Sequence, residues 1–210
     1  MEENKLNVIR PFGPAIAKVK MPEKIINALN DHVDKIVNNE ELSKKFDNGK
    51  YLAGNVKQEL SLSKEISEES GWSSFLANST RAWIKFCMGK NITEFHIHNS
   101  WVVRQFANEY NPVHWHSGHI SGAGFLKLPS TFGETFQKDK KNLNGKLSLI
   151  HGQRAFMSDS LFKITPLVGD FYIFPHYLMH TVYPFKDTDE ERRSVSFNAV
   201  IDEEIFDVFY

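Results

Sequence analysis

The stretch Asn111-Pro-Val-His114-Trp-His116-Ser-Gly-His119 carries three of the nine histidines of the chain. On an extended segment, side chains at i and i+2 point to the same face, so His114 and His116 can share one metal ion. A third imidazole, His180, lies in the segment 174–182, which is rich in aromatic and apolar residues. The three histidines together predict a metal site supported by extended chain segments.

The sequence around and beyond this stretch has the texture of β structure. From residue 91 to the end, β-branched and aromatic runs alternate with Gly, Pro, Asn and Asp, as in short strands joined by turns. These runs cover residues 92–106, 123–128, 146–151, 167–174, 181–183 and 195–201. We therefore expect a β-rich core over residues 92–210.

The first 91 residues are expected to support this core. Residues 5–20 contain short edge strands interrupted by Pro11 and Pro14. Apolar residues recur at helical spacing from Pro22 to about Lys45, and again from Trp72 to Phe86. Residues 47–70 are polar and rich in Gly, Asn, Ser and Glu, which favours a loop or flap. The fold class is therefore mainly β with flanking helices (α+β), with helices covering one sheet of a sandwich or distorted barrel.

Composition limits the classes of function. At 210 residues and 41% hydrophobic content, the chain is expected to form one domain, 1–210, with a real core. The net charge of −1 gives no support to nucleic-acid binding. Neither an export signal nor a membrane span is indicated, so a cytoplasmic protein is expected. The only cysteine, Cys87, lies in an apolar run and is assigned to packing.

Four segments resemble the 2-oxoglutarate-Fe(II) oxygenase family of bacteria and phages. The resemblance spans about residues 95–200. The segments are Asn111-Pro-Val-His114-Trp-His116, Ser121-Gly-Ala-Gly-Phe125-Leu-Lys127-Leu-Pro129, Gly169-Asp-Phe-Tyr-Ile-Phe-Pro175 followed by His180, and Glu191-Arg192-Arg-Ser194-Val-Ser-Phe-Asn198. The resemblance implies a double-stranded β-helix (jelly roll, cupin-like) core. It also implies iron(II), 2-oxoglutarate as cosubstrate, O2, and hydroxylation of a primary substrate with formation of succinate and CO2.

Carried over residue by residue, the resemblance implies that His114 and His180 are the two histidine ligands of iron. His116 stands where the wider superfamily usually has Asp or Glu, and this family tends to carry the His-x-His form. An imidazole does not neutralise a charge of the metal as a carboxylate would. His119 is a spare donor, but it could reach the same ion only through a turn at Ser117-Gly118.

The pair Arg192-x-Ser194 resembles the pair that holds the distal carboxylate of 2-oxoglutarate. On a strand, Arg192 and Ser194 share one face, whereas Arg193 lies on the other, so we assign the cosubstrate to Arg192. The alternative is that both arginines lie on a solvated surface strand. Phe125 stands where related enzymes often have a tyrosine. The compensating polar group could be Ser121, Lys127 or Asn198, and the pattern does not choose among them.

Two other functions remain open from the residues alone. One is a three-histidine cupin-type dioxygenase that binds substrate directly to iron, which His116 favours and Arg192-x-Ser194 opposes. The other is a non-catalytic β-barrel with a structural metal. The primary substrate is not indicated, and residues 47–70 and 130–145 are expected to shape its site. A homodimer through the helical face is compatible with the pattern, although no heptad repeat supports one.

Minor histidines and aromatic residues receive structural roles. His32 and His151 are interpreted as structural, and His96 and His98 as sheet histidines. His176 is a candidate for orienting a ligand imidazole through a hydrogen bond. The aromatic residues near the histidine motif are interpreted as core or pocket wall, namely Trp101, Phe106, Tyr110 and Trp115.

Overall fold

A computed structural model describes residues 6–9, 13–49, 54–136 and 140–207. Its larger sheet has seven antiparallel strands in the order β1-β2-β9-β6-β11-β4-β3. These strands are β1 (Asn7–Ile9), β2 (Ile16–Lys20), β3 (Gln58–Ser61), β4 (Phe95–Gln105), β6 (Ile120–Lys127), β9 (Asp170–Pro175) and β11 (Arg192–Ile201). β4, β6 and β11 are the longest strands, and β11 carries the predicted cosubstrate pair Arg192-x-Ser194.

A second antiparallel sheet lies opposite the first, with the order β5-β10-β7-β8. Its strands are β5 (Asn111–His114), β7 (Leu147–Ile150), β8 (Leu161–Ile164) and β10 (Met179–Val182). Apolar side chains from both sheets form one cluster, for example Phe125 and Phe174 from the larger sheet and Leu149 from the smaller. The predicted β-rich core with a jelly-roll arrangement is confirmed.

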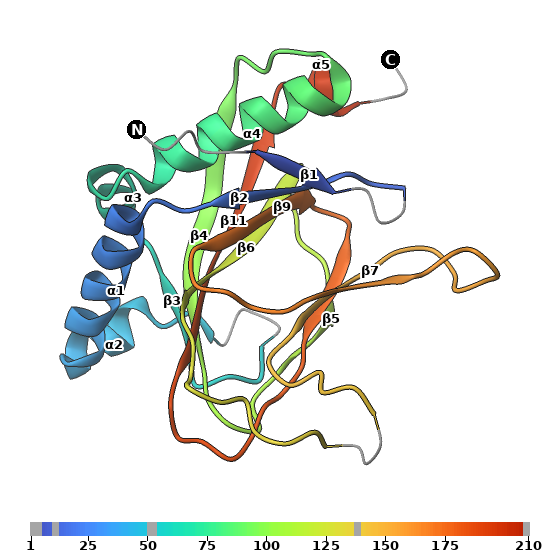
Figure 1. Cartoon of the computed structure of the whole chain (residues 1–210). Coiled ribbons are helices and arrows are strands. Elements are labelled where there is room, and N and C mark those ends of the chain that lie inside the picture. Colours follow the sequence, from blue (N-terminus) through green and yellow to red (C-terminus); the bar gives the residue numbers. More distant parts are fainter. Residues whose placement is uncertain (1–5, 10–12, 50–53, 137–139, 208–210) are drawn as a thin grey trace.

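Helices cover the outer face of the larger sheet (Figure 1). The helices are α1 (Glu23–Val37), α2 (Glu40–Phe46), α3 (Lys64–Glu69), α4 (Trp72–Met88) and α5 (Glu203–Phe206). α1 presents Leu29 and Val33 to the sheet, both fully buried. The ring of Trp72 in α4 packs edge-on against Phe171 of β9, with centroids 5.1 Å apart. The predicted helix over 72–86 is confirmed, as is its aromatic contact with the sheet.

The single helix expected from Pro22 to Lys45 is two helices. α1 ends at Val37, and α2 begins at Glu40 after Asn39, whose side chain accepts a hydrogen bond from the Leu42 N–H. Asparagine is a preferred N-cap because its side chain satisfies an N–H that the helix leaves free. The apolar spacing continued across the break and concealed it.

The loop expected over 47–70 is also wrong for much of its length. β3 pairs with β4 and forms the edge of the larger sheet, and α3 follows it. Two further strands, β5 and β8, lie outside the predicted runs. Residues 130–136 and 140–145 contain no strand or helix, as expected of a flap. The interruption expected at Pro11 lies outside the described residues.

No helix among the described residues is long and apolar enough to cross a lipid bilayer.

Candidate functional site

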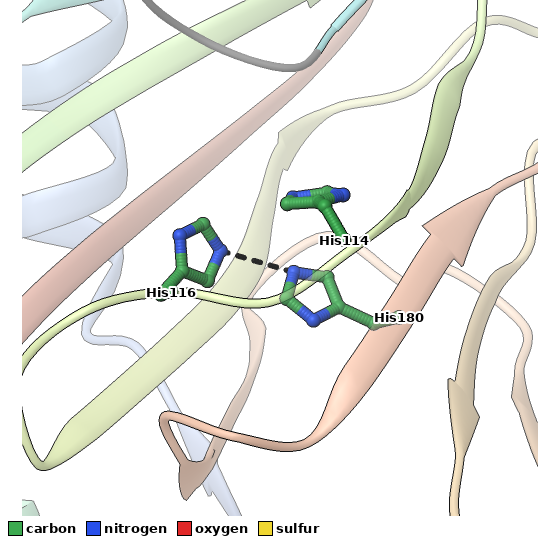
Figure 2. Close-up of side chains that lie close together, drawn as sticks. All are labelled: His114, His116 and His180. Carbon is green, nitrogen blue, oxygen red and sulfur yellow. Dashed lines mark hydrogen bonds between the residues drawn. The ribbon is translucent and has the colours of Figure 1, made fainter.

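Three histidine side chains converge between the two sheets. His114 ends β5 and lies directly opposite His180 of β10 in the strand register, and His116 follows two residues after β5. One ring nitrogen from each residue lies within 4.8 Å of the other two. Figure 2 shows the three rings turned toward one another. The structure therefore brings together the three predicted ligands, two from neighbouring strands and one from the segment after β5.

Backbone carbonyls fix the tautomers of two of these rings. His114 Nδ1 donates to the Pro112 carbonyl at 2.7 Å, and His180 Nδ1 donates to the Leu178 carbonyl at 2.9 Å. In a neutral ring whose Nδ1 carries the proton, Nε2 keeps a free lone pair. Both Nε2 atoms are thus prepared as metal donors. Such hydrogen bonds to the second ring nitrogen are typical of histidines that ligate metals.

The third ring, that of His116, forms a hydrogen bond with His180. His116 Nε2 and His180 Nε2 are 3.0 Å apart (dashed line in Figure 2). Since His180 donates through Nδ1, its Nε2 accepts, and His116 Nε2 holds the proton between them. Burial lowers the pKa of His116 to about 3 and that of His180 to about 4, with neighbouring imidazoles contributing. The cluster is therefore neutral at pH 7 and offers lone pairs rather than positive charge.

His119 does not belong to this cluster. Its ring stacks on Phe206 with centroids 3.8 Å apart, and its Nδ1 accepts the Ile201 N–H. It lines a separate, mostly apolar cavity of about 690 Å³ beside α4 and α5. His116, ranked above His119 from the sequence, is the residue that faces His114 and His180.

The remaining histidines lie apart from the ligand nitrogens. His176 donates from Nδ1 to the backbone carbonyl of His116 at 3.0 Å. It therefore fixes the chain at His116 rather than a ligand ring, which corrects the expected role. His96 and His98 are exposed on β4.

Arg192 and Ser194 lie on the cavity face of β11, together with Ser196 and Asn198. The Arg192 guanidinium is 1% exposed and lies over the Phe125 ring at 5.2 Å. One of its terminal nitrogens donates to Gln105 Oε1 and to Ser194 Oγ, each at 3.2 Å. Its Nε has no hydrogen-bond partner, and no carboxylate among the described residues pairs with it. Burial lowers the pKa of Arg192 to about 10, so it stays charged at neutral pH.

Arg193 points to the opposite face of β11. It is bound by Glu191 and by Asp34 of α1, both at 2.7 Å, and Arg104 also pairs with Glu191. Arg193 thus joins a helix to the sheet, which agrees with the alternation that assigned the cosubstrate to Arg192. Both arginines are buried, so the alternative of a solvated surface strand is wrong.

The Phe125 ring packs against the Arg192 guanidinium, and no tyrosine hydroxyl is present at that position. Of the three candidates to replace it, Lys127 is exposed at the end of β6. Ser121 is buried and donates to Asn198 Oδ1 at 2.6 Å. Asn198 lines the cavity, so it is the one candidate that reaches this space.

The histidines and Arg192 line one cavity of about 380 Å³ between the sheets. Trp101 forms part of its wall, and Trp115 lies at its edge with 66% of its surface exposed. Phe106 and Tyr110 do not line it. Three lining or neighbouring residues were missed from the sequence, namely Glu59, Gln105 and Asn111. Gln105 of β4 lies directly opposite Arg192 of β11, and only the strand register reveals that pairing.

Comparisons with known proteins agree with this geometry. Residues 99–198 match the family model described as "Putative 2OG-Fe(II) oxygenase". The match covers just under half of the chain, and this half contains the three histidines and Arg192. The family implies Fe(II), 2-oxoglutarate, O2 and a primary substrate as co-reactants, consistent with three histidines and a buried arginine around one cavity. A search of curated proteins finds no significant match.

Solved structures support the 2OG-Fe(II) oxygenase fold. A prolyl-4-hydroxylase from Pseudomonas putida is 12% identical, with a TM-score of 0.56 over 87% of this chain and 91% of that one. A viral collagen prolyl hydroxylase from Paramecium bursaria Chlorella virus-1, solved with 2OG, is 14% identical, with a TM-score of 0.52 over 88% and 94%. The alpha-ketoglutarate-dependent epimerase SnoN, from nogalamycin biosynthesis, is 12% identical, with a TM-score of 0.56 over 88% and 77%.

Proposed function

We propose that this 2OG-Fe(II) oxygenase is a hydroxylase in which His114, His116 and His180 hold iron(II). Arg192 and Ser194 hold the distal carboxylate of 2-oxoglutarate. When bound, iron(II) and 2-oxoglutarate supply the activation of O2 and the oxidation of a substrate C–H bond, with succinate and CO2 as products. The chain's own residues place the reactants and exclude water.

The observation that carries this proposal is the unpaired charge of Arg192. A buried guanidinium normally has an acidic partner, because removing it from water is costly otherwise. Arg192 has only neutral partners, and its Nε has none. A ligand carboxylate would supply the missing charge, and the fork of guanidinium N–H groups suits bidentate contact with it. Ser194 Oγ, already in contact with Arg192, is placed to donate to the same carboxylate.

The donor set also fits iron(II). Two Nε2 atoms have free lone pairs because their Nδ1 atoms donate to carbonyls. His116 would move its proton from Nε2 to Nδ1 when a metal binds at Nε2, because one nitrogen cannot hold both the proton and the metal. Because the pKa of His116 is lowered, its ring carries only one proton at neutral pH, and metal binding does not have to displace another. Three neutral imidazoles would not offset the charge of the iron(II) ion, so its full charge would attract the anionic cosubstrate.

The apolar part of the cavity wall suits oxidation of a bound substrate. Trp101 is 6% exposed and, with Val103 and Val182, forms an apolar wall beside the polar groups. A dry wall favours oxidation of the bound substrate over side reactions with water. Two of the solved structures with this fold are titled prolyl hydroxylases, and one is titled an epimerase. Turnover of 2-oxoglutarate tests the oxygenase activity, and the oxidised product would then distinguish a hydroxylase from another oxygenase.

The test is turnover of 2-oxoglutarate labelled at its 1-carbon, with iron(II), ascorbate and O2. We expect slow release of labelled CO2 with an equal amount of succinate even without primary substrate. Arg192→Gln should reduce the rate at low 2-oxoglutarate by about 100-fold, since charged hydrogen bonds contribute about 1.5–3 kcal/mol each. The exposed-site control His98→Gln should leave it unchanged. An iron-loaded wild type that releases no CO2 above the metal-free background would refute the proposal.

A further inference from the structure

Glu59 is a buried carboxyl group in the same cavity, and the proposed iron and 2-oxoglutarate sites do not use it. It comes from β3, the edge strand of the larger sheet, and is 2% exposed. In the strand register Glu59 lies beside Val103, which lies beside Ser194 on the other side of β4. Cross-strand neighbours share a face, so Glu59 faces the cavity about two strand spacings, or roughly 10 Å, from the Ser194 row.

No described basic side chain pairs with this carboxyl group. Its Oε2 is buried without a hydrogen-bond partner, and the charged residue that affects it most is Asp47, which is also acidic. Burial and, to a lesser degree, Asp47 raise the pKa of Glu59 to about 7. Arg192, in the same cavity, forms no ion pair with it. Among the described residues, the cavity wall therefore holds one cation and one acid that lack an oppositely charged partner, and the two lie in different parts of the wall.

A second acceptor lies beside Glu59. Asn111 Oδ1 is buried and without a hydrogen-bond partner. A Cβ atom built on Gly54 would lie 2.3 Å from Asn111 Oδ1 and 2.6 Å from Glu59 Oε1, so these oxygens are no more than about 5 Å apart. One donor group can contact both oxygens at that separation. A side chain at residue 54 would displace these two oxygens, whereas glycine leaves them in place.

We infer that Glu59 and Asn111 bind a protonated amine or guanidinium group of the primary substrate. This inference rests on the proposed function, because it assigns the anionic cosubstrate to Arg192 and the cationic substrate to Glu59. An unpaired buried acid favours a ligand that brings both hydrogen-bond donors and positive charge. Such a ligand satisfies Glu59 and Asn111 together and ionises Glu59 when it binds. A substrate without a donor would leave both acceptors unpaired.

The test uses four probes with short alkyl chains on the metal-free protein: n-butylammonium, n-butylguanidinium, n-butanol and butyrate. Calorimetric titration at pH 7 should show binding of the two cations at least about tenfold tighter than butanol, and Glu59→Gln should abolish this preference. Glu41→Gln, an exposed acid on α2, is the matched control. Equal binding of butanol and n-butylammonium to the wild type would overturn the inference, whatever the Glu59→Gln variant shows.

A second readout follows Glu59 itself. In protein labelled with 13C at glutamate carboxyl carbons, the signal missing from Glu59→Gln identifies this residue. Adding n-butylammonium at pH 7 should move that signal toward its ionised position, and butanol should not. A signal that n-butylammonium leaves unmoved would also overturn the inference. Because these measurements need neither iron nor 2-oxoglutarate, failure of the proposed oxygenase activity would leave their result interpretable.

Discussion

Arg192 and Arg193 are neighbours in sequence and equally buried, but only Arg193 has acidic partners. Arg193 is bound by Glu191 and Asp34, whereas Arg192 contacts only the neutral groups of Gln105 and Ser194. Breaking a buried ion pair costs about 3–5 kcal/mol, because a charge is left unpaired. Replacing an unpaired buried charge by an apolar side chain of similar length has no such cost.

Arg193→Met is therefore expected to reduce the free energy of unfolding of the metal-free protein by about 3 kcal/mol. Arg192→Met should leave it unchanged or raise it by about 1 kcal/mol, while 2-oxoglutarate binding is lost. Urea denaturation of the wild type and both variants measures the difference. Equal losses of stability would mean that Arg192 is structural rather than reserved for a ligand.

The stability of the metal-free protein should also depend on pH through Glu59. Its pKa is raised from 4.5 to about 7 in the folded protein. The folded state thus holds the proton more tightly, so this contribution is present below pH 4.5 and is lost as pH rises toward 7. Glu59→Gln removes it. The stability difference between wild type and Glu59→Gln should change by roughly 3 kcal/mol between pH 4.5 and 7.5. Parallel stability curves would show an ordinary pKa at Glu59.

Residue roles were predictable where a local pattern carried them. Alternation along 192–198 separates Arg192 from Arg193, because strand geometry fixes the face of each residue. The role of Glu59 was not predictable, since its segment is polar and short. Only pairing of β3 with β4, which are far apart in the chain, turns Glu59 toward the cavity.

At the scale of elements, two glycines have positive φ but different surroundings, so substituting each tests backbone strain with and without an effect on the site. Gly89 ends α4 with φ 70°, and a Cβ atom there would meet nothing within 4 Å. Gly118, with φ 90°, lies in the turn after His116, and a Cβ atom there would be 2.9 Å from the Ala199 carbonyl oxygen. Both positions favour glycine, but of the two only Gly118 is crowded and close to the proposed metal ligands.

Gly89→Ala should reduce the free energy of unfolding by about 1–2 kcal/mol and leave iron affinity unchanged. Gly118→Ala should cost more and should also weaken iron binding, because the turn that holds His116 must move. Thermal denaturation and equilibrium metal titration of both variants check this. Unchanged iron affinity in Gly118→Ala would show that His116 is positioned independently of that turn.

Most elements followed from periodicity, and the exceptions have physical causes. The strands of the core have β-branched and aromatic runs, and α4 has a clear apolar face. The break between α1 and α2 escaped notice because apolar spacing continues through Asn39. β5 and β8 are four residues long, too short for a period to emerge. Tertiary pairing, rather than local preference, makes them strands.

At the scale of the whole molecule, we propose that residues 1–91 and 92–210 form one folding unit. Side chains of α1 and α4 fill the outer face of the larger sheet, and β2 and β3 extend that sheet on both sides. A fragment 92–210 should therefore expose a large apolar face, bind a hydrophobic dye and lack a near-UV circular dichroism signal. A fragment with a cooperative unfolding transition would instead show an independent core.

The central claim is that three histidines hold iron(II) beside Arg192, which receives 2-oxoglutarate. Anaerobic titration of the iron(II)-loaded protein with 2-oxoglutarate, followed by the weak visible metal-to-ligand charge-transfer band, tests it most directly. The account predicts a saturable band in the wild type and in His98→Gln, no band in His116→Ala, and a need for about 100-fold more 2-oxoglutarate in Arg192→Gln. An iron-loaded wild type that forms no band, or an Arg192→Gln variant that titrates like wild type, would contradict it.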